Sequence, residues 1–373
     1  MRIGVISSVF GSPWAGSEEL WYQTSLKALA NAHQVKASIF EVYSPCSQLD
    51  NFKKEGGDVL FRKRFRNGRI HMIKHKYVSA FTSLFKWNPD VLILSLGGLP
   101  DLLLYPDLHR HLKANNNIRV ILICLFNSDN TIYNDQTRSV INFFCQRAEH
   151  LVFVSKHNYL LAERQLASKF KSVSVFSSPV SYMDSYTRLD WPKDNDVLKM
   201  ACVARLDVQA KGQDILLASL AEPQWKNRPW HLSIYGKGAD EEYIRSLVKL
   251  YDLTDRVSFT GFTPDTREIW KTHHVMVMAS RAEGLSLAIL EAMICGRVCV
   301  VSDVGDNAEV INDSHSGFLS EGPQPKYFGA ALERAWNMRD QLQKIGANAS
   351  ETTAKIFEEA PVDKLLKIIE NNL

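Results

Sequence analysis

The chain has 373 residues, of which 45% are hydrophobic and 23% are charged, and its net charge is +3. This length suits about two domains, and the composition is that of a soluble globular protein. No run of about 18 uninterrupted apolar residues occurs, so a membrane-spanning helix is not expected. Because the first residues also lack the apolar run of a signal sequence, we expect a cytoplasmic protein.

In the first half of the chain, continuous apolar runs alternate with stretches of helical period. The runs that predict strands are residues 3–7, 35–40, 91–95, 120–125, 151–154 and 173–176. The stretches that predict helices are residues 18–30, 100–114, 137–147 and 156–167. A polar, turn-rich segment follows, and residues 181–196 are predicted to be a linker.

The second half repeats this alternation. Its predicted strands are residues 199–204, 231–235, 257–260, 274–278 and 298–302, and its predicted helices are residues 212–221, 241–251, 266–271 and 286–294. Apolar strands that alternate with helices indicate parallel sheets covered on both faces. The predicted fold class is therefore α/β, with two Rossmann-like, doubly wound domains, residues 1–180 and 197–350, facing each other across a cleft. Residues 351–373 are expected to be helical, and the last helix could pack back on the first domain.

The candidate metal ligands and thiols do not form a recognisable framework. The six cysteines are scattered without a CxxC pair, which predicts buried, reduced thiols. His273 and His274 are adjacent at the start of an expected strand and would point to opposite faces. Cys295 and Cys299 flank a helix-to-strand turn. We therefore expect no bound metal.

A basic segment lies between residues 52 and 87. Ten lysines and arginines are opposed there only by Glu55 and Asp58, and aromatic residues are interleaved with them. Such a pattern is typical of a solvated face beside core aromatics, or of a surface that meets an anionic membrane or acceptor. Residues 53–76 are therefore a candidate for peripheral membrane contact.

The most informative segment is residues 280–293. Gly284 would break the chain after a predicted strand, and the exposed amides of the helix that follows would form an anion site. Glu283 lies at the mouth of this helix, and Glu291 lies about a turn and a half into it. Carboxylates repel a phosphate but accept hydrogen bonds from hydroxyls on either side of it, which a nucleotide-sugar offers. Taken singly, each glutamate is better explained as a capping or exposed helical residue.

Three further clusters follow predicted strands. Arg205 and Lys211 lie after the first strand of the second half, where both cations could converge on one diphosphate, although two surface cations explain the pair equally well. Gly16 follows the first strand of the chain and would let the backbone approach a phosphate closely. Gly236 and Lys237 belong to a GxG turn, which alone is too short to be a dinucleotide fingerprint.

These motifs occur in a familiar order. The Arg205 and Lys211 pair, the Glu-x7-Glu spacing of Glu283 and Glu291, and residues 304–311 together resemble the carboxyl-terminal domain of glycosyltransferase family 4, the retaining GT-B glycosyltransferases. Residues 15–18 resemble the amino-terminal glycine-rich loop of that family, so the resemblance covers nearly the whole chain. It implies a GT-B fold and sugar transfer from a nucleoside-diphosphate sugar, most commonly a UDP-sugar, to a saccharide or lipid-linked acceptor. It implies no metal and no nucleic-acid partner.

The resemblance also implies a role for each matching residue. Arg205 and Lys211 would bind the donor diphosphate, Glu283 the donor sugar and Glu291 the ribose. The other donor contacts would come from Gly16, Gly236, Lys237, Phe262, Thr263, Gly284, Leu285 and Ser286. The acceptor hydroxyl would attack on the face that the diphosphate leaves, so the reaction needs cations for the leaving group and no dedicated side-chain base.

The sequence departs from the family pattern after the strand predicted at residues 120–125. A histidine is usual there, whereas this chain has Asn127 and Asp129, which become acceptor-side candidates. Ser178 replaces an asparagine before a Pro-Val pair, and Asp306 replaces the second glycine of a Val-Gly-Gly turn.

Three rival interpretations stay open at this point. A metal-dependent transferase would use the Asp-x-Asp pattern of residues 194–196, which turn chemistry in the linker explains better. A sugar-nucleotide epimerase of similar fold would act without an acceptor. A two-lobed sugar-binding protein would lack catalysis altogether.

Overall fold

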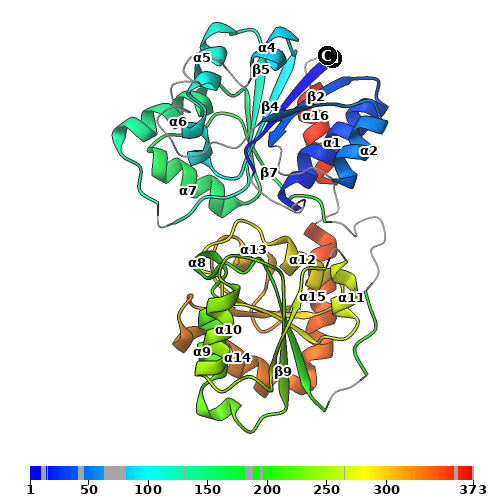
Figure 1. Ribbon diagram of the computed structural model, residues 1–373, viewed down its shortest axis with the longest axis vertical. Coiled ribbons are helices and arrows are strands. Elements are labelled where there is room, and N and C mark those ends of the chain that lie inside the picture. Colours follow the sequence, from blue (N-terminus) through cyan, green and yellow to red (C-terminus); the bar gives the residue numbers. More distant parts are fainter. Residues whose placement is uncertain are drawn as a thin grey trace. The chain divides into compact units, whose positions relative to one another are not determined.

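The computed structural model describes residues 1–9, 14, 16–40, 46–62, 81–129, 131–180, 188–193, 196–263, 265–356 and 360–371. The chain divides into two compact units. Unit 1 comprises Met1–Pro179 together with Glu359–Leu373, and unit 2 comprises Val180–Glu358. Each unit is an α/β structure built on one parallel sheet, as predicted (Figure 1).

Unit 1 contains a seven-stranded sheet with the order β3-β2-β1-β4-β5-β6-β7. The strands are β1 (Arg2–Ser7), β2 (Gln34–Phe40), β3 (Asp58–Arg62), β4 (Val91–Leu96), β5 (Arg119–Cys124), β6 (His150–Phe153) and β7 (Val173–Val175). The helices are η1 (Gly16–Glu18), α1 (Glu19–Ala30), α2 (Ser47–Lys54), α4 (Thr82–Lys86), η3 (Leu99–Leu104), α5 (Pro106–Ala114), α6 (Asp135–Arg147), α7 (Lys156–Leu166) and α16 (Pro361–Glu370). The sequence analysis missed β3 because this edge strand is half-exposed and carries charged residues at both ends.

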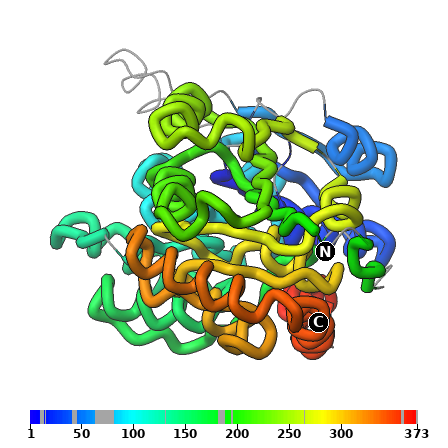
Figure 2. The backbone as a smooth tube through the Cα atoms, turned by 90° about the horizontal axis from the view of Figure 1, so that it is seen from below, coloured from blue at the N-terminus to red at the C-terminus, as the bar shows by residue number. Residues whose placement is uncertain are grey.

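The last helix of the chain belongs to unit 1. Helix α16 packs against α1, and Figures 1 and 2 show the two side by side. Lys27 of α1 forms an ion pair with Asp363, and Nε2 of His33 lies 3.0 Å from a carboxylate oxygen of Glu370. Arg119 of β5 donates a 2.8 Å hydrogen bond to the carbonyl of Ile369 near the carboxyl end of α16. The two parts of unit 1 are therefore joined by packing and by polar contacts.

Unit 2 contains a six-stranded sheet with the order β10-β9-β8-β11-β12-β13. The strands are β8 (Leu198–Val203), β9 (Trp230–Tyr235), β10 (Val257–Gly261), β11 (Val275–Met278), β12 (Val298–Ser302) and β13 (Phe318–Ser320). The helices are α8 (Val208–Lys211), α9 (Gln213–Leu220), η5 (Pro223–Trp225), α10 (Glu241–Leu250), α11 (Thr266–Trp270), α12 (Leu287–Ile294), α13 (Asn307–Val310), α14 (Pro325–Asn337), η6 (Arg339–Gln341) and α15 (Leu342–Ile356).

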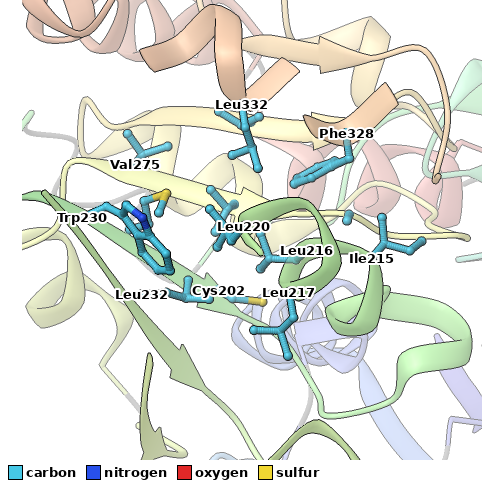
Figure 3. Close-up of a cluster of buried hydrophobic side chains, with 14 of the residues drawn as sticks. Cys202, Ile215, Leu216, Leu217, Leu220, Trp230, Leu232, Val275, Phe328 and Leu332 are labelled. Carbon is cyan, nitrogen blue, oxygen red and sulfur yellow. The ribbon is translucent and has the colours of Figure 1, made fainter. Parts of the chain in front are cut away.

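Both faces of the unit 2 sheet are covered by helices. Alternate strand residues, such as Cys202 and Val275, face α9, α10 and α14, and Figure 3 shows side chains of α9 and α14 meeting those of β8, β9 and β11. The intervening residues, such as Ala201 and Met276, face α11, α12 and α15. A strand whose two faces are both buried reads as a continuous apolar run, which is why these strands could be predicted from the sequence.

Some predictions fall partly outside the described residues. The predicted linker includes residues 181–187, 194 and 195, and the basic segment includes residues 63–80, all of which lie outside the described part of the chain. All six cysteines are free and all but Cys46 are buried, so burial is as predicted for five of them. No helix in the described part of the chain is long and apolar enough to span a membrane.

Candidate active site

The candidate site lies where the strand order of unit 2 reverses, between β8 and β11. Open α/β sheets bind ligands at such a switch point, beyond the carboxyl ends of the strands. The predicted donor residues of unit 2 follow these strand ends: Arg205 and Lys211 after β8, Gly236 and Lys237 after β9, Phe262 and Thr263 after β10, and Glu283, Gly284, Leu285 and Ser286 after β11, with Glu291 in α12. The fold therefore gathers residues from four separate stretches of sequence at one edge of the sheet.

An ion pair bridges this switch point. Nζ of Lys211 donates to both carboxylate oxygens of Glu283, at 2.7 Å each, and the Glu283 side chain is only 6% exposed. The hydroxyl of Ser280 donates a further 2.6 Å hydrogen bond to the same carboxylate. The family resemblance implies a diphosphate contact for Lys211 and a sugar contact for Glu283; the structure adds that the two side chains bind each other.

Local backbone geometry places Lys211 at this point. It is the last residue of α8, a single turn whose amino end is capped by the Asp207 carboxylate, and Gly212 ends the turn with a φ of 61°. The predicted helix at residues 212–221 is therefore preceded by a separate turn. A Cβ atom on Gly212 would lie 1.9 Å from the carbonyl oxygen of Ala279, so only glycine allows the chain after β8 to pass this close to the end of β11.

The loop that carries Glu283 is held from both sides. Arg281 forms two 2.7 Å hydrogen bonds with the Asp214 carboxylate, which ties the loop to the start of α9. On the other side, the amide of Asp306 donates to the carbonyl of Gly284 at 3.3 Å. A Cβ atom on Gly305 would lie 2.4 Å from the carbonyl oxygen of Glu283. Glu283 is therefore positioned before any ligand arrives.

Groups that can bind an anion lie beside the Lys211–Glu283 ion pair. The Arg205 side chain is 63% exposed and donates one 2.8 Å hydrogen bond to Asp207. Helix α12 begins at Leu287, slightly later than predicted, and Ser286 precedes it without a side-chain cap. Within the described residues, the amides of Gly284, Leu285 and Ser286 have no hydrogen-bond acceptor. Unpaired amides at the start of a helix can bind a phosphate, and so can a guanidinium that makes one hydrogen bond and is otherwise exposed.

Glu291 is not an exposed helical residue, which is the explanation favoured when this glutamate is considered alone. Its carboxylate accepts a 2.8 Å hydrogen bond from the hydroxyl of Thr266, and both residues are partly buried. Burial is the largest influence on the carboxyl, and it raises the pKa of Glu291 to about 7. The residue is thus a hydrogen-bonding group whose charge changes near neutral pH.

The residues expected near the base form the next part of the same edge. Gly236 has a φ of 132°, and its amide donates to the carbonyl of Gly261 at 2.8 Å, which joins the ends of β9 and β10. Lys237 is exposed, and the ring of Phe262 is 49% exposed. An exposed aromatic ring beside a glycine turn can stack on a planar ligand.

Unit 1 has an equivalent switch point between β1 and β4. The hydroxyl of Ser8 donates a 2.5 Å hydrogen bond to the Asp101 carboxylate, and burial raises the pKa of Asp101. Gly16 opens η1 beside this edge, although residues 10–13 and 15 of its loop lie outside the described residues. Glu18 is fully buried and accepts a 2.7 Å hydrogen bond from Ser7. Burial raises the pKa of Glu18 to about 7.

Arg62 corrects one part of the sequence analysis, which counted it within the basic surface segment. The residue is 5% exposed, and its guanidinium donates to the backbone carbonyls of Ser7 and Ser38. The guanidinium carbon lies 4.4 Å from the centre of the Phe40 ring and 5.1 Å from that of Phe81. Arg62 therefore ties strand ends together inside unit 1, and membrane contact by residues 53–76 stays a prediction for the other residues.

The two acceptor-side candidates have different surroundings. Asn127 is buried, its backbone amide donates a 2.7 Å hydrogen bond to the side-chain oxygen of Asn158, and its side-chain amide donates to the Asn158 carbonyl at 3.2 Å. Asp129 lies at the surface, 2.9 Å from Nε2 of His157 and 3.3 Å from Arg164. Asn127 is fixed in place after β5, whereas Asp129 belongs to a surface ion-pair cluster.

Known proteins are similar to the part of the chain that carries this site. Residues 198–338, less than half of the chain, match the family model described as glycosyl transferases group 1. The matched region contains all six strands of the unit 2 sheet and every site residue predicted in unit 2. The family resemblance seen in the sequence is thereby confirmed at this level.

Relatives of the group 1 domain extend the match into unit 1. The amylovoran biosynthesis glycosyltransferase AmsD of Erwinia amylovora is 26% identical over 271 residues, which cover 70% of this chain and 72% of AmsD. EpsD of Bacillus subtilis is 26% identical over 158 residues, 42% of each chain. The chain spans 42%, 32% and 24% of the length of the first three curated relatives that it matches.

Solved structures show the same fold over the whole chain. The crystal structure of Anabaena HepE in complex with UDP superposes with a TM-score of 0.75, at 14% identity, over the full length of both chains. The predicted GT-B fold class is therefore confirmed.

Proposed function

We propose that the chain transfers a sugar from a UDP-sugar to a saccharide or lipid-linked acceptor, with retention of configuration and without a metal. The observation that carries the proposal is the Lys211–Glu283 ion pair, which lies at the switch point of a group 1 glycosyltransferase domain beside unpaired amides. Two relatives support the choice of substrates, because HepE is solved with UDP and AmsD is named for polysaccharide biosynthesis.

Hydrogen-bond capacity allows the paired residues to act on a donor. An ammonium group has three N–H donors, and Lys211 uses two of them on Glu283, so one is left for a phosphate oxygen. The Glu283 carboxylate has about four acceptor sites and receives three hydrogen bonds, from Lys211 and Ser280, so one is left for a sugar hydroxyl. Lys211 would thus contact the phosphate and Glu283 the sugar, so the paired residues would lie on either side of the sugar–phosphate bond that breaks.

The reaction develops negative charge on the terminal phosphate of the departing UDP. Lys211, Arg205 and the amides of Gly284–Ser286 would stabilise this charge, and such preorganised donors are typically the largest contribution to catalysis. The acceptor hydroxyl would attack on the face that UDP leaves, and the departing phosphate oxygen would take its proton. Glu291 would accept a hydrogen bond from a ribose hydroxyl.

Removal of one cation tests the proposal. We expect Lys211→Ala and Arg205→Ala each to lower acceptor-dependent UDP release by ~10²-fold or more, the typical cost of losing one strong electrostatic donor. Lys271→Ala is the matched control, because this exposed lysine pairs with Glu268 on the surface of the same unit. Full activity in both site variants would show that these residues are assigned wrongly.

The same assay separates the rival functions. An epimerase would convert the UDP-sugar without an acceptor, and a sugar-binding protein would release no UDP. Activity that persists in EDTA supports the metal-free reaction, and NMR of the product reports whether the anomeric configuration is retained.

A further inference from the structure

Unit 2 has a cavity at the opposite edge of its sheet from the candidate donor site. The cavity has a volume of about 450 Å³, within the range of small-molecule sites. Its lining includes Leu198, the first residue of β8, and Pro229 and His274, which immediately precede β9 and β11. Since β8 has six residues, about 3.3 Å each, the cavity lies roughly 20 Å from the strand ends that carry Arg205.

Two indole rings form the aromatic part of the lining, and neighbouring residues hold both in place. Trp191 lies against the ring of His274, with the ring centres 5.4 Å apart. Trp336 lies edge-on to Trp225 at 5.7 Å, and the guanidinium of Arg228 covers it at 5.0 Å. Both indoles are partly exposed. Aromatic surfaces that are fixed in this way bind a ligand at little cost in side-chain entropy.

The polar part of the lining has mixed hydrogen-bonding character. Asp196, Arg339, Asp340 and Gln343 line the cavity and are all exposed. In the described chain, neither carboxylate nor Arg339 takes part in an ion pair. Arg339 donates a 3.4 Å hydrogen bond to the carbonyl of Trp336, and its guanidinium carbon lies 5.3 Å from the centre of the Trp336 ring. Two carboxylates outweigh one guanidinium, so the cavity disfavours phosphates and nucleotides. It offers donors and acceptors to a neutral ligand with many hydroxyls.

From this combination we propose that the cavity binds a neutral saccharide, with the C–H face of a sugar ring against an indole and its hydroxyls on Asp340 and Gln343. Nothing in the donor site is needed for this binding. The extension that the bound saccharide is a distal part of the acceptor or product chain rests on the proposed function.

Saturation-transfer NMR on the full chain tests the proposal with a fixed panel of glucose, galactose, mannose, N-acetylglucosamine, maltose and lactose, with UDP in excess to occupy the donor site. We expect at least one saccharide to bind, and the double variant Asp340→Ala/Gln343→Ala to weaken its dissociation constant at least ten-fold. The matched control is Gln341→Ala/Lys344→Ala, because these exposed neighbours do not line the cavity. Its dissociation constant should be unchanged.

A second variant, Asp196→Asn, changes no helix and should weaken binding at least three-fold. The thermal unfolding midpoint and the far-ultraviolet circular dichroism spectrum of each variant report whether the chain is folded. The proposal is overturned if no saccharide of the panel binds, or if the double variant and Asp196→Asn both bind as the unmodified chain does. This readout does not depend on turnover, so a failure of the proposed transferase activity would leave it intact.

Discussion

The two units have the same kind of switch point but different chemistry there. In unit 1, the loops after β1 and β4 are joined by the Ser8 hydroxyl and the Asp101 carboxylate. In unit 2, the loops after β8 and β11 are joined by the Lys211 ammonium and the Glu283 carboxylate. The hydrogen-bond donor is a neutral hydroxyl in unit 1 and a cationic ammonium in unit 2. The shared topology therefore determines where a ligand would bind, whereas a few loop residues determine which ligand charge fits. An anionic ligand, such as the proposed donor, is therefore expected to fit unit 2.

The largest expected effect sharpens this comparison on the unit 1 side, where the Glu18 carboxyl is fully buried. In the unfolded chain the Glu18 carboxyl ionises near pH 4.5, whereas in the folded chain it keeps its proton up to about pH 7. The stabilisation by this proton is fully present below pH 4.5 and is lost as the pH rises through 7. At ~1.4 kcal/mol per pKa unit, we expect the free energy of unfolding to fall by about 3 kcal/mol from this group.

Denaturant titrations at pH 5 and pH 8 measure this loss. The Glu18→Gln variant should have a flatter pH dependence than the unmodified chain, and Glu291, which has the same sign of shift, cancels in the comparison. Glu55→Gln, at an exposed carboxyl of unit 1, is the control. Equal pH dependence in Glu18→Gln and the unmodified chain would contradict the prediction.

A glycine substitution in unit 2 tests whether the position of the Glu283 carboxylate matters for activity. Gly305→Ala would place a Cβ atom 2.4 Å from the Glu283 carbonyl and so displace the carboxylate that binds Lys211. We expect UDP release to fall by ~10²-fold, because misplacing a catalytic group by about 1 Å has effects of this size.

Gly56→Ala is the matched control for that substitution. Gly56 also has a positive φ, of 94°, but a Cβ atom there would meet nothing within 4 Å. Both variants carry backbone strain, so only Gly305→Ala should lose activity. If the two variants keep the same turnover, the contact with the Glu283 loop is unimportant for the reaction.

The smallest expected effect concerns donor affinity. Because burial raises the pKa of Glu291 to about 7, the group gains its charge as the pH rises from 6 to 8. A carboxylate accepts a hydrogen bond more strongly than a carboxyl group does. Calorimetry should therefore show UDP binding that tightens up to about ten-fold over this range, and Glu291→Gln should remove the change. A constant affinity in the unmodified chain would exclude a ribose contact by this side chain.

Most of the fold could be predicted from the sequence because most strands are buried on both faces. One missed strand has a physical reason, because β3 is a half-exposed edge strand that carries charged residues at both ends. The candidate donor residues could be located because each follows a strand. Their pairing could not, since Lys211 and Glu283 are 72 residues apart. Arg62 looked like a surface charge because Phe40 and Phe81, which enclose it, come from other segments.

The place of α16 has a consequence for biosynthesis. Unit 2 is continuous in sequence, so all of it has been translated before α16 appears. Unit 1 lacks the partner of α1 until then, because Leu365, Leu366 and Ile369 of α16 supply buried side chains to it. Nascent chains usually fold from the amino end. Here the second unit can mature first, and the first keeps an uncovered apolar surface until α16 has been synthesised.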